Sequence, residues 1–194
     1  MTTDKRQNGT RSMRRTVVTV LCFLWMGFIF YMSARPSDLS TNDSYSVGML
    51  IGRTFVSGFS ARPFAEQLAF VGRIDHILRK TAHFLEYFIL FRLLYSGPVG
   101  LLEDKGKGPF LRTSVFSSGK NAAAKRAARA FACAAAAAIA GVLYAASDEI
   151  HQLFVPGRAG RFGDIMIDSA GVLTAAALTV LAAYLRARRS RREE

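Results

Sequence analysis

The sequence predicts an all-α, polytopic membrane protein, and three observations support that prediction. First, 51% of the 194 residues are hydrophobic although 21% are charged. Second, the apolar residues gather into four blocks close to the length of about 20 residues that a helix needs to cross a bilayer. Third, the Lys and Arg residues, which help to give the chain a net charge of +12, are concentrated beside these blocks. We therefore expect one membrane domain covering residues 1–194, with about four transmembrane helices.

The first span is expected at residues 16–33, after a polar head that carries five Lys and Arg residues. A basic head before an apolar core is also how a signal peptide begins. The apolar block is long for a signal peptide, and Met32-Ser33-Ala34 is not a clean small-x-small cleavage site. An uncleaved anchor is therefore favoured, with Trp25 facing lipid or the membrane interface.

Residues 35–75 are predicted to connect the first and second spans. Pro36 ends the first helix, since proline disfavours a helical conformation at the residue before it. Residues 37–46 are rich in Ser, Thr, Asn and Asp, which is typical of a loop. Apolar residues then recur at helical spacing over Val47–Phe59 and Phe64–Ile77, which predicts short interfacial helices on the membrane surface.

The second span is expected at residues 77–95, where Gly97-Pro98 ends the helix. On a helix, Lys80, His83 and Tyr87 fall in one narrow stripe with Glu86 on its flank. The opposite face, which includes Phe91, can meet lipid. Residues 98–126 are polar and basic, and we interpret them as a flexible cytoplasmic loop.

The third span, residues 127–146, is dominated by alanine and suits close helix packing. Ala137, Gly141 and Ala145 recur every four residues, which is a small-xxx-small face. Asp148 and Gln152 continue that face, so both side chains are expected to point towards other helices.

The fourth span is expected at residues 164–185. Asp164, Asp168 and Gly171 lie on one stripe that should face the bundle. Val172 and Leu178 lie off that stripe and are expected to be compatible with lipid.

Topology predicts that the polar segments meet. Four spans place both termini and the 98–126 loop on one side, together with 17 of the 26 Lys and Arg residues. The positive-inside rule makes that side cytoplasmic, in a multi-pass protein of the cell membrane. The start of the second span, the end of the third and the start of the fourth are then all on the outer face.

The positive net charge does not by itself predict that the protein binds nucleic acid. Basic proteins often bind nucleic acid, but this sequence does not interleave aromatic and basic residues as a base-stacking surface does. Cys22 and Cys133 both lie within apolar blocks and match no metal-ligand spacing. No nucleic-acid partner and no cofactor are predicted.

Two sequence strings resemble the VanZ-like family. They are RKTAHFLEY, residues 79–87, and YAASDEIHQLFVPGRAGRFGDIMIDSAG, residues 144–171. Members of the family carry R-K-x-x-H-x-x-E-Y, then S-D-E-x-H-Q with a later Arg, then D-x-x-x-[ND]-x-x-G. Asp168 stands where many relatives have Asn. The resemblance implies a small polytopic protein of the bacterial cell membrane, with a link to resistance against the glycopeptide teicoplanin.

The clustered residues allow several kinds of chemistry at the outer face. An acid/base site would use the histidines and carboxylates, and the remaining polar groups would bind the substrate. The catalytic candidates are His83, Glu86, Asp148, Glu149 and His151. The candidates for substrate binding are Lys80, Tyr87, Gln152, Arg158, Asp164 and Asp168. The expected partners are membrane lipids, a lipid-linked cell-wall precursor or a glycopeptide, because Lys80 and Arg158 can hold an anionic headgroup.

Three alternatives stay open from the sequence. A zinc or manganese site could use His83, Asp148, Glu149 and His151. The same residues could bind a ligand without reacting, or line a transport path. They could also be a structural lock between helices, pairing Lys80 with Asp148, Arg158 with Asp164 and His83 with Glu149.

Overall fold

The computed structural model describes residues 2–104 and 122–190, and in these ranges the chain is helical with no β-strand. Four helices are long and apolar enough to cross a membrane, which confirms the prediction of an all-α, multi-pass membrane protein. The elements are α1 (Thr2–Ser33), α2 (Ser37–Phe55), the 3₁₀ helix η1 (Phe59–Ala61), α3 (Phe64–Ser96), α4 (Pro98–Asp104), α5 (Ala122–Gln152) and α6 (Phe162–Ser190).

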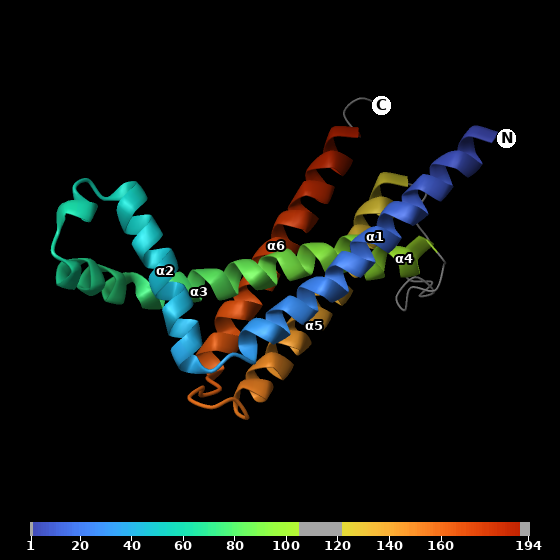
Figure 1. Ribbon diagram of the computed structural model, residues 1–194. Helices are drawn as coiled ribbons and strands as arrows, with labels where there is room; N and C mark the ends of the chain where they lie inside the picture. The colour runs from blue at the N-terminus through green and yellow to red at the C-terminus, as the bar shows by residue number, and fades with distance from the viewer. Residues whose placement is uncertain (1, 105–121, 191–194) are drawn as a thin grey trace.

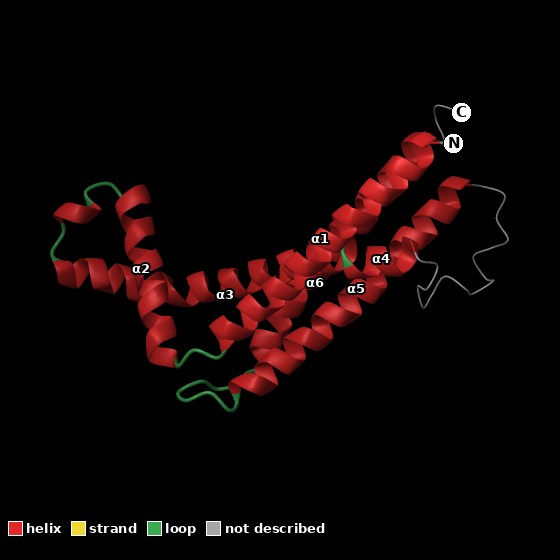
Figure 2. Cartoon of the chain, turned by 45° about the vertical axis from the view of Figure 1, so that its right-hand side comes forward, coloured by secondary structure: helices red, strands yellow, loops and turns green. Residues whose placement is uncertain are grey.

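The helices form a bundle with one arm (Figure 1). The axes of α1, α5 and α6 are inclined in a similar way, but α6 runs antiparallel to α1 and α5, so the beginning of α1 and the end of α6 lie at the same end of the bundle. Helix α3 crosses this bundle obliquely. Its first part forms a hairpin with α2 and η1 that stands away from the other helices in both views (Figures 1 and 2). The end of α1, the end of α5 and the start of α6 therefore lie together at the opposite end.

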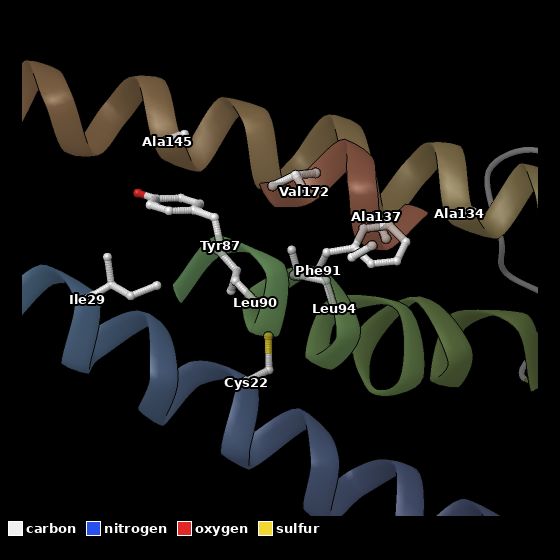
Figure 3. Close-up of a cluster of buried hydrophobic side chains, with 11 residues drawn as sticks. Cys22, Ile29, Tyr87, Leu90, Phe91, Leu94, Ala134, Ala137, Ala145 and Val172 are labelled. Atoms are coloured by element: carbon white, nitrogen blue, oxygen red, sulfur yellow. The ribbon is translucent and has the colours of Figure 1, made fainter. Parts of the chain in front are cut away.

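The core lies where α3 passes between α1, α5 and α6 (Figure 3). Tyr87, Leu90 and Phe91 of α3 are fully buried there. The small-residue face of α5 packs against them, as predicted, since Ala137 and Ala145 are also fully buried. Two side chains expected to meet lipid, Phe91 and Val172, belong to this core instead.

Helices α3 and α6 cross at Gly171. A Cβ atom at this position would lie 2.2 Å from the backbone oxygen of Phe84, so only glycine fits without moving a helix. Val172 packs beside the crossing against Gly141, where an added Cβ would lie 3.0 Å from Val172 Cγ2. This close approach explains why Val172 is buried rather than exposed to lipid.

The segment between the first two spans differs from the prediction. Residues 37–46 are the first part of α2, not a loop. Pro36 stands before the first turn, where its missing N–H costs nothing. The hydroxyls of Thr41 and Ser46 donate to the carbonyls of Ser37 and Asn42, at 2.8 and 2.9 Å, so these polar side chains are satisfied within the helix. The segment Phe64–Ile77 is not a separate interfacial helix, because it is continuous with the second span in α3.

The 98–126 segment is helical at both ends. Helix α3 ends at Ser96, as the Gly97-Pro98 pair predicts, but α4 then covers Pro98–Asp104 and α5 begins at Ala122. The prediction of a flexible loop is wrong for those flanks. Its centre, residues 105–121, lies outside the described residues.

Candidate functional site

The polar segments of α3 and α6 meet face to face. Lys80 Nζ forms an ion pair with Asp164 Oδ1, and His83 Nδ1 lies 3.4 Å from Asp168 Oδ1. Successive turns of α3 thus contact successive turns of α6 below the crossing at Gly171. Asp168 is fully buried, and the imidazole of His83 lies against its carboxylate. A protonated imidazole offsets the free-energy cost of burying this negative charge.

The end of α5 adds two buried carboxylates. Asp148 and Glu149 are 4% and 3% exposed. Gln152 Nε2 donates to Asp148 Oδ2 at 3.4 Å, along the helix face that the sequence predicts. The backbone N–H of Arg161 donates to Glu149 Oε1 at 2.6 Å, which ties the α5–α6 loop to the end of α5.

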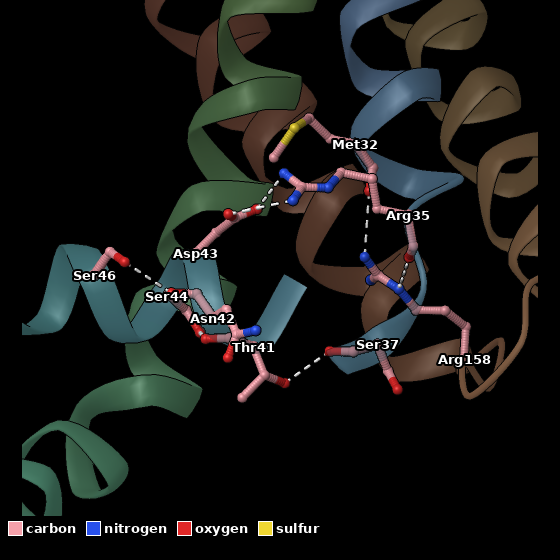
Figure 4. Close-up of polar contacts among 9 residues, drawn as sticks. All are labelled: Met32, Arg35, Ser37, Thr41, Asn42, Asp43, Ser44, Ser46 and Arg158. Carbon is pink, nitrogen blue, oxygen red and sulfur yellow. Dashed lines mark hydrogen bonds and ion pairs between the residues drawn. The ribbon is translucent and has the colours of Figure 1, made fainter. Parts of the chain in front are cut away.

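Arg158 in the same loop reaches back to α1 (Figure 4). Its Nε donates to the carbonyl of Arg35 at 3.1 Å, and its second terminal nitrogen donates to the carbonyl of Met32 at 3.2 Å. Burial lowers the pKa of Arg158, and the neighbouring Arg79 lowers it further, whereas Asp148 and Glu149 act in the opposite direction. Arg158 is thus a partly buried cation placed next to two carboxylates.

These groups surround a cavity of about 220 Å³ that lies between α1, α2 and α3. Asp148, near the end of α5, and Arg158, in the α5–α6 loop, complete its wall. Its polar wall includes His83, Glu86, Asp148 and Arg158. Its apolar wall includes the side chains of Ile29, Met32, Val47, Leu78 and Ala82. Ligand sites usually combine such apolar lining with a few convergent polar groups, so this cavity is the best candidate for a binding site.

Two carboxylates of the wall are not satisfied by the protein. Asp148 Oδ1 has no hydrogen-bond partner among residues 2–104 and 122–190. Ser33 is a close neighbour of Asp148, but its Oγ is itself without a partner in the same residues. Glu86 interacts with other described residues only through longer-range electrostatics, not through a hydrogen bond. Buried polar groups normally have partners, so Asp148 Oδ1 and Ser33 Oγ lie where a ligand could supply one.

Some predicted site residues lie outside the cavity wall. Tyr87 is fully buried in the core beside Tyr144, with 6.3 Å between the ring centroids. The ring of His151 stacks on Phe30 of α1, with centroids 4.4 Å apart, and His151 is not part of the cavity wall. Glu149 binds a backbone N–H instead of lining the cavity.

The predicted lock has other partners than the sequence indicates. Lys80 pairs with Asp164 rather than Asp148, and His83 faces Asp168 rather than Glu149. Arg158 binds backbone carbonyls rather than Asp164. The first two differences have one cause, because α3 presents Lys80 and His83 to α6 and not to α5. The sequence carries no signal for that choice.

Several polar contacts of the α2 arm were missed. Arg35 forms an ion pair with Asp43, and Ser44 donates to Asp75, which also pairs with Arg79 at 2.5 Å. The i,i+4 spacing of Asp75 and Arg79 is a signal that could have been used.

The indole of Trp25 was also misjudged. Its Nε1 donates to the carbonyl of Glu86 at 3.0 Å, so one edge of the ring points into the protein and not to lipid. This bond joins α1 to α3 next to the cavity, because Glu86 is part of the cavity wall.

The metal-site alternative gains no support from the arrangement. In the part of the chain that the structure describes, no three His, Cys, Asp or Glu side chains are close enough to hold one ion. His151 stacks on Phe30, and Glu149 accepts a hydrogen bond from the backbone N–H of Arg161, so two of the four proposed ligands have other contacts.

Comparison with known proteins places this arrangement in a family. The model of the VanZ/LLP1 family matches residues 18–183. This range includes all of α3 and α5, parts of α1 and α6, and every residue of the cavity wall. No curated protein and no solved structure matches the chain.

Proposed function

The chain belongs to the VanZ/LLP1 family of membrane proteins, and from this premise we propose that it binds an envelope lipid or lipid-linked precursor by its headgroup in the cavity beside Arg158. The observation that carries the proposal is the mixed lining of the cavity. Arg158 offers charged donors, whereas the side chains of Ile29, Met32 and Val47 offer hydrocarbon. A ligand with a charged head and an apolar tail matches both walls.

The donors suit a phosphate group. Guanidinium groups bind phosphate oxygens through strong, charge-assisted hydrogen bonds, often two at a time. Arg158 is held by two backbone carbonyls, which fix its side chain in place before a ligand arrives. Preorganisation of this kind reduces the entropy lost on binding.

The charge distribution supports an orientation with the cavity at the outer face of the cell membrane. The two terminal segments, the segment between α3 and α5, and the start of α5 up to Arg129 together carry 17 of the 26 Lys and Arg residues. The positive-inside rule then assigns both termini to the cytoplasm. We propose that the cavity meets lipid headgroups of the outer leaflet, and that expression lowers the sensitivity of the cell to teicoplanin, as the family resemblance implies.

Mass spectrometry of lipids that copurify with the protein tests the binding proposal. The wild-type protein should retain a defined phosphate-bearing lipid after extensive detergent washing. Arg158→Ala should lose that lipid, whereas Arg73→Ala should keep it, because Arg73 is exposed on the α2–α3 arm and outside the cavity wall. Equal lipid content in the two variants would contradict the proposal.

A susceptibility assay tests the link to the drug. A Gram-positive host that expresses the wild-type chain should require more teicoplanin for growth inhibition than a host expressing Arg158→Ala at equal membrane abundance. Identical inhibitory concentrations in these hosts and in an empty-vector host would refute the link.

Acid/base chemistry on the bound lipid is a second candidate. His83 lines the cavity, and its Nδ1 faces the buried Asp168 at 3.4 Å, which orients the ring so that Nε2 is the proton-exchanging nitrogen. His83→Gln separates the candidates. It should keep the bound lipid in both cases, but it should abolish the effect on teicoplanin sensitivity only if proton transfer is required.

A further inference from the structure

The charged residues around the cavity do not balance one another. Three carboxylates have a cationic or protonatable neighbour. Asp43 pairs with Arg35, Asp75 pairs with Arg79, and Asp168 faces His83. These contacts occupy most of the positive charge that α1, α2 and α3 bring to this end of the bundle.

The carboxylates left over are Glu86 and Asp148, and the cation left over is Arg158. Asp148 is 4% exposed, lines the cavity, and has an Oδ1 atom without a partner among the described residues. Its neighbours Ser33 and Gln152 are neutral, so they can donate hydrogen bonds but cannot neutralise its charge. The cavity therefore has an excess of one negative charge when both carboxylates are ionised.

A buried carboxylate without a counter-ion is costly, and proteins normally place a cation next to it. Two Lys or Arg side chains line the cavity in the described ranges, Arg158 and Arg79, and Arg79 is already paired with Asp75. An ammonium group of a ligand can offset one of these two carboxylates, and protonation neutralises the other.

We infer that the headgroup bound in this cavity carries an ammonium group, which Asp148 and Glu86 receive, next to the phosphate that Arg158 receives. This inference rests on the proposed function and deepens it, because it names the class of lipid. An ammonium group has three N–H donors and one positive charge, so it satisfies Asp148 Oδ1 and one oxygen of Glu86 together. The acyl chains lie along the apolar wall formed by Ile29, Met32 and Val47.

Intrinsic fluorescence gives a direct assay. Trp25 is the only tryptophan of the chain, and its indole N–H is bonded to the carbonyl of Glu86 in the cavity wall. Purified full-length protein in detergent is titrated with phosphatidylethanolamine and with phosphatidylglycerol that carry the same acyl chains. The two lipids share the phosphate and differ in the amine.

Phosphatidylethanolamine should bind about tenfold or more tightly than phosphatidylglycerol, because a hydrogen bond between charged groups contributes more than one between neutral groups. Asp148→Asn should remove most of this preference and leave the affinity for phosphatidylglycerol equal or higher. Glu66→Gln is the matched control, since Glu66 is an exposed carboxylate at the start of α3 and outside the cavity wall. It should keep the preference of the wild type.

The outcomes separate this inference from the proposed function. Equal affinity for the two lipids, or tighter binding of phosphatidylglycerol, overturns the ammonium site and leaves lipid binding intact. Binding of neither lipid overturns both. Glycerophosphoethanolamine, which has no acyl chains, should fail to compete. If it competes as well as the intact lipid, the ligand is a soluble amine and the lipid proposal is wrong.

A folding defect in Asp148→Asn would be visible as a lower thermal unfolding midpoint. Glu86→Gln then serves as the second variant, because Glu86 is half-buried, lines the cavity and has no side-chain hydrogen bond to lose within the described residues. It should lower the preference for the amine lipid by several-fold. An unchanged preference in both variants overturns the inference.

Discussion

Replacing Gly171 by alanine tests how tightly α3 and α6 are held together, and hence how the site is assembled. The new methyl group would lie 2.2 Å from the backbone oxygen of Phe84 and 3.2 Å from the backbone nitrogen of Phe88. Backbone atoms cannot rotate away as a flexible side chain can. The helices must separate by roughly 1 Å to restore an ordinary contact, and overpacking of this kind costs typically 1–3 kcal/mol.

Two effects of opposite sign decide the size of the change. Overpacking against backbone belongs near the upper end of that range, at about 3 kcal/mol. Alanine offsets part of it, because glycine in a helix is less favourable by roughly 0.5–1 kcal/mol. The net loss is about 2 kcal/mol, which lowers the thermal unfolding midpoint Tm of a chain of this size by about 4–8 °C.

The assay is thermal unfolding of the purified protein in detergent, followed by the fluorescence of Trp25. Gly27→Ala is the matched control, since an added Cβ at Gly27 of α1 meets nothing within 4 Å. It should leave Tm unchanged or raise it. A Tm for Gly171→Ala equal to that of the control would refute the close crossing of α3 and α6.

Three further predictions concern single contacts. A double-mutant cycle with Lys80→Met and Asp164→Asn should give a coupling energy of about 0.6 kcal/mol, and of no more than roughly 1.7 kcal/mol, as for other polar contacts between membrane helices. A coupling energy of zero would show that the ion pair is absent. Trp25→Phe should lower the stability by about 1 kcal/mol, because it removes the hydrogen bond to the carbonyl of Glu86. An unchanged Tm, followed by circular dichroism since the variant has no tryptophan, would argue against that bond. Cys22 is fully buried, so its thiol should react slowly with a maleimide in the folded protein and fast in dodecyl sulfate, as mapped by peptide mass spectrometry. Fast labelling of the folded protein would place the thiol at the surface.

The sequence predicts the spans and the inward face of α5 well, for physical reasons. Blocks of apolar residues must cross the bilayer as helices because no other local structure satisfies the backbone there. Small residues every four positions mark a face that packs closely, and Ala137 and Ala145 are indeed buried. The convergence of the polar segments follows from the number of spans alone, and the contacts of Lys80, His83 and Arg158 confirm it.

The pairing within the site was beyond such reasoning. Which turn of α3 faces which turn of α6 depends on where the two backbones can approach, and that point is Gly171. The sequence shows the glycine but not its partner, Phe84. The helical start of α2 was missed for a different reason, since Ser and Thr residues that look like a loop bond back to the carbonyls of their own helix.

A structure of the protein in nanodiscs made from lipids of a Gram-positive envelope tests the central claim most directly. The account predicts density for one lipid whose phosphate contacts Arg158, whose amine contacts Asp148 and Glu86, and whose chains follow Ile29 and Met32. An empty cavity, with ordered lipid only on the outer surfaces of the helices, would contradict it.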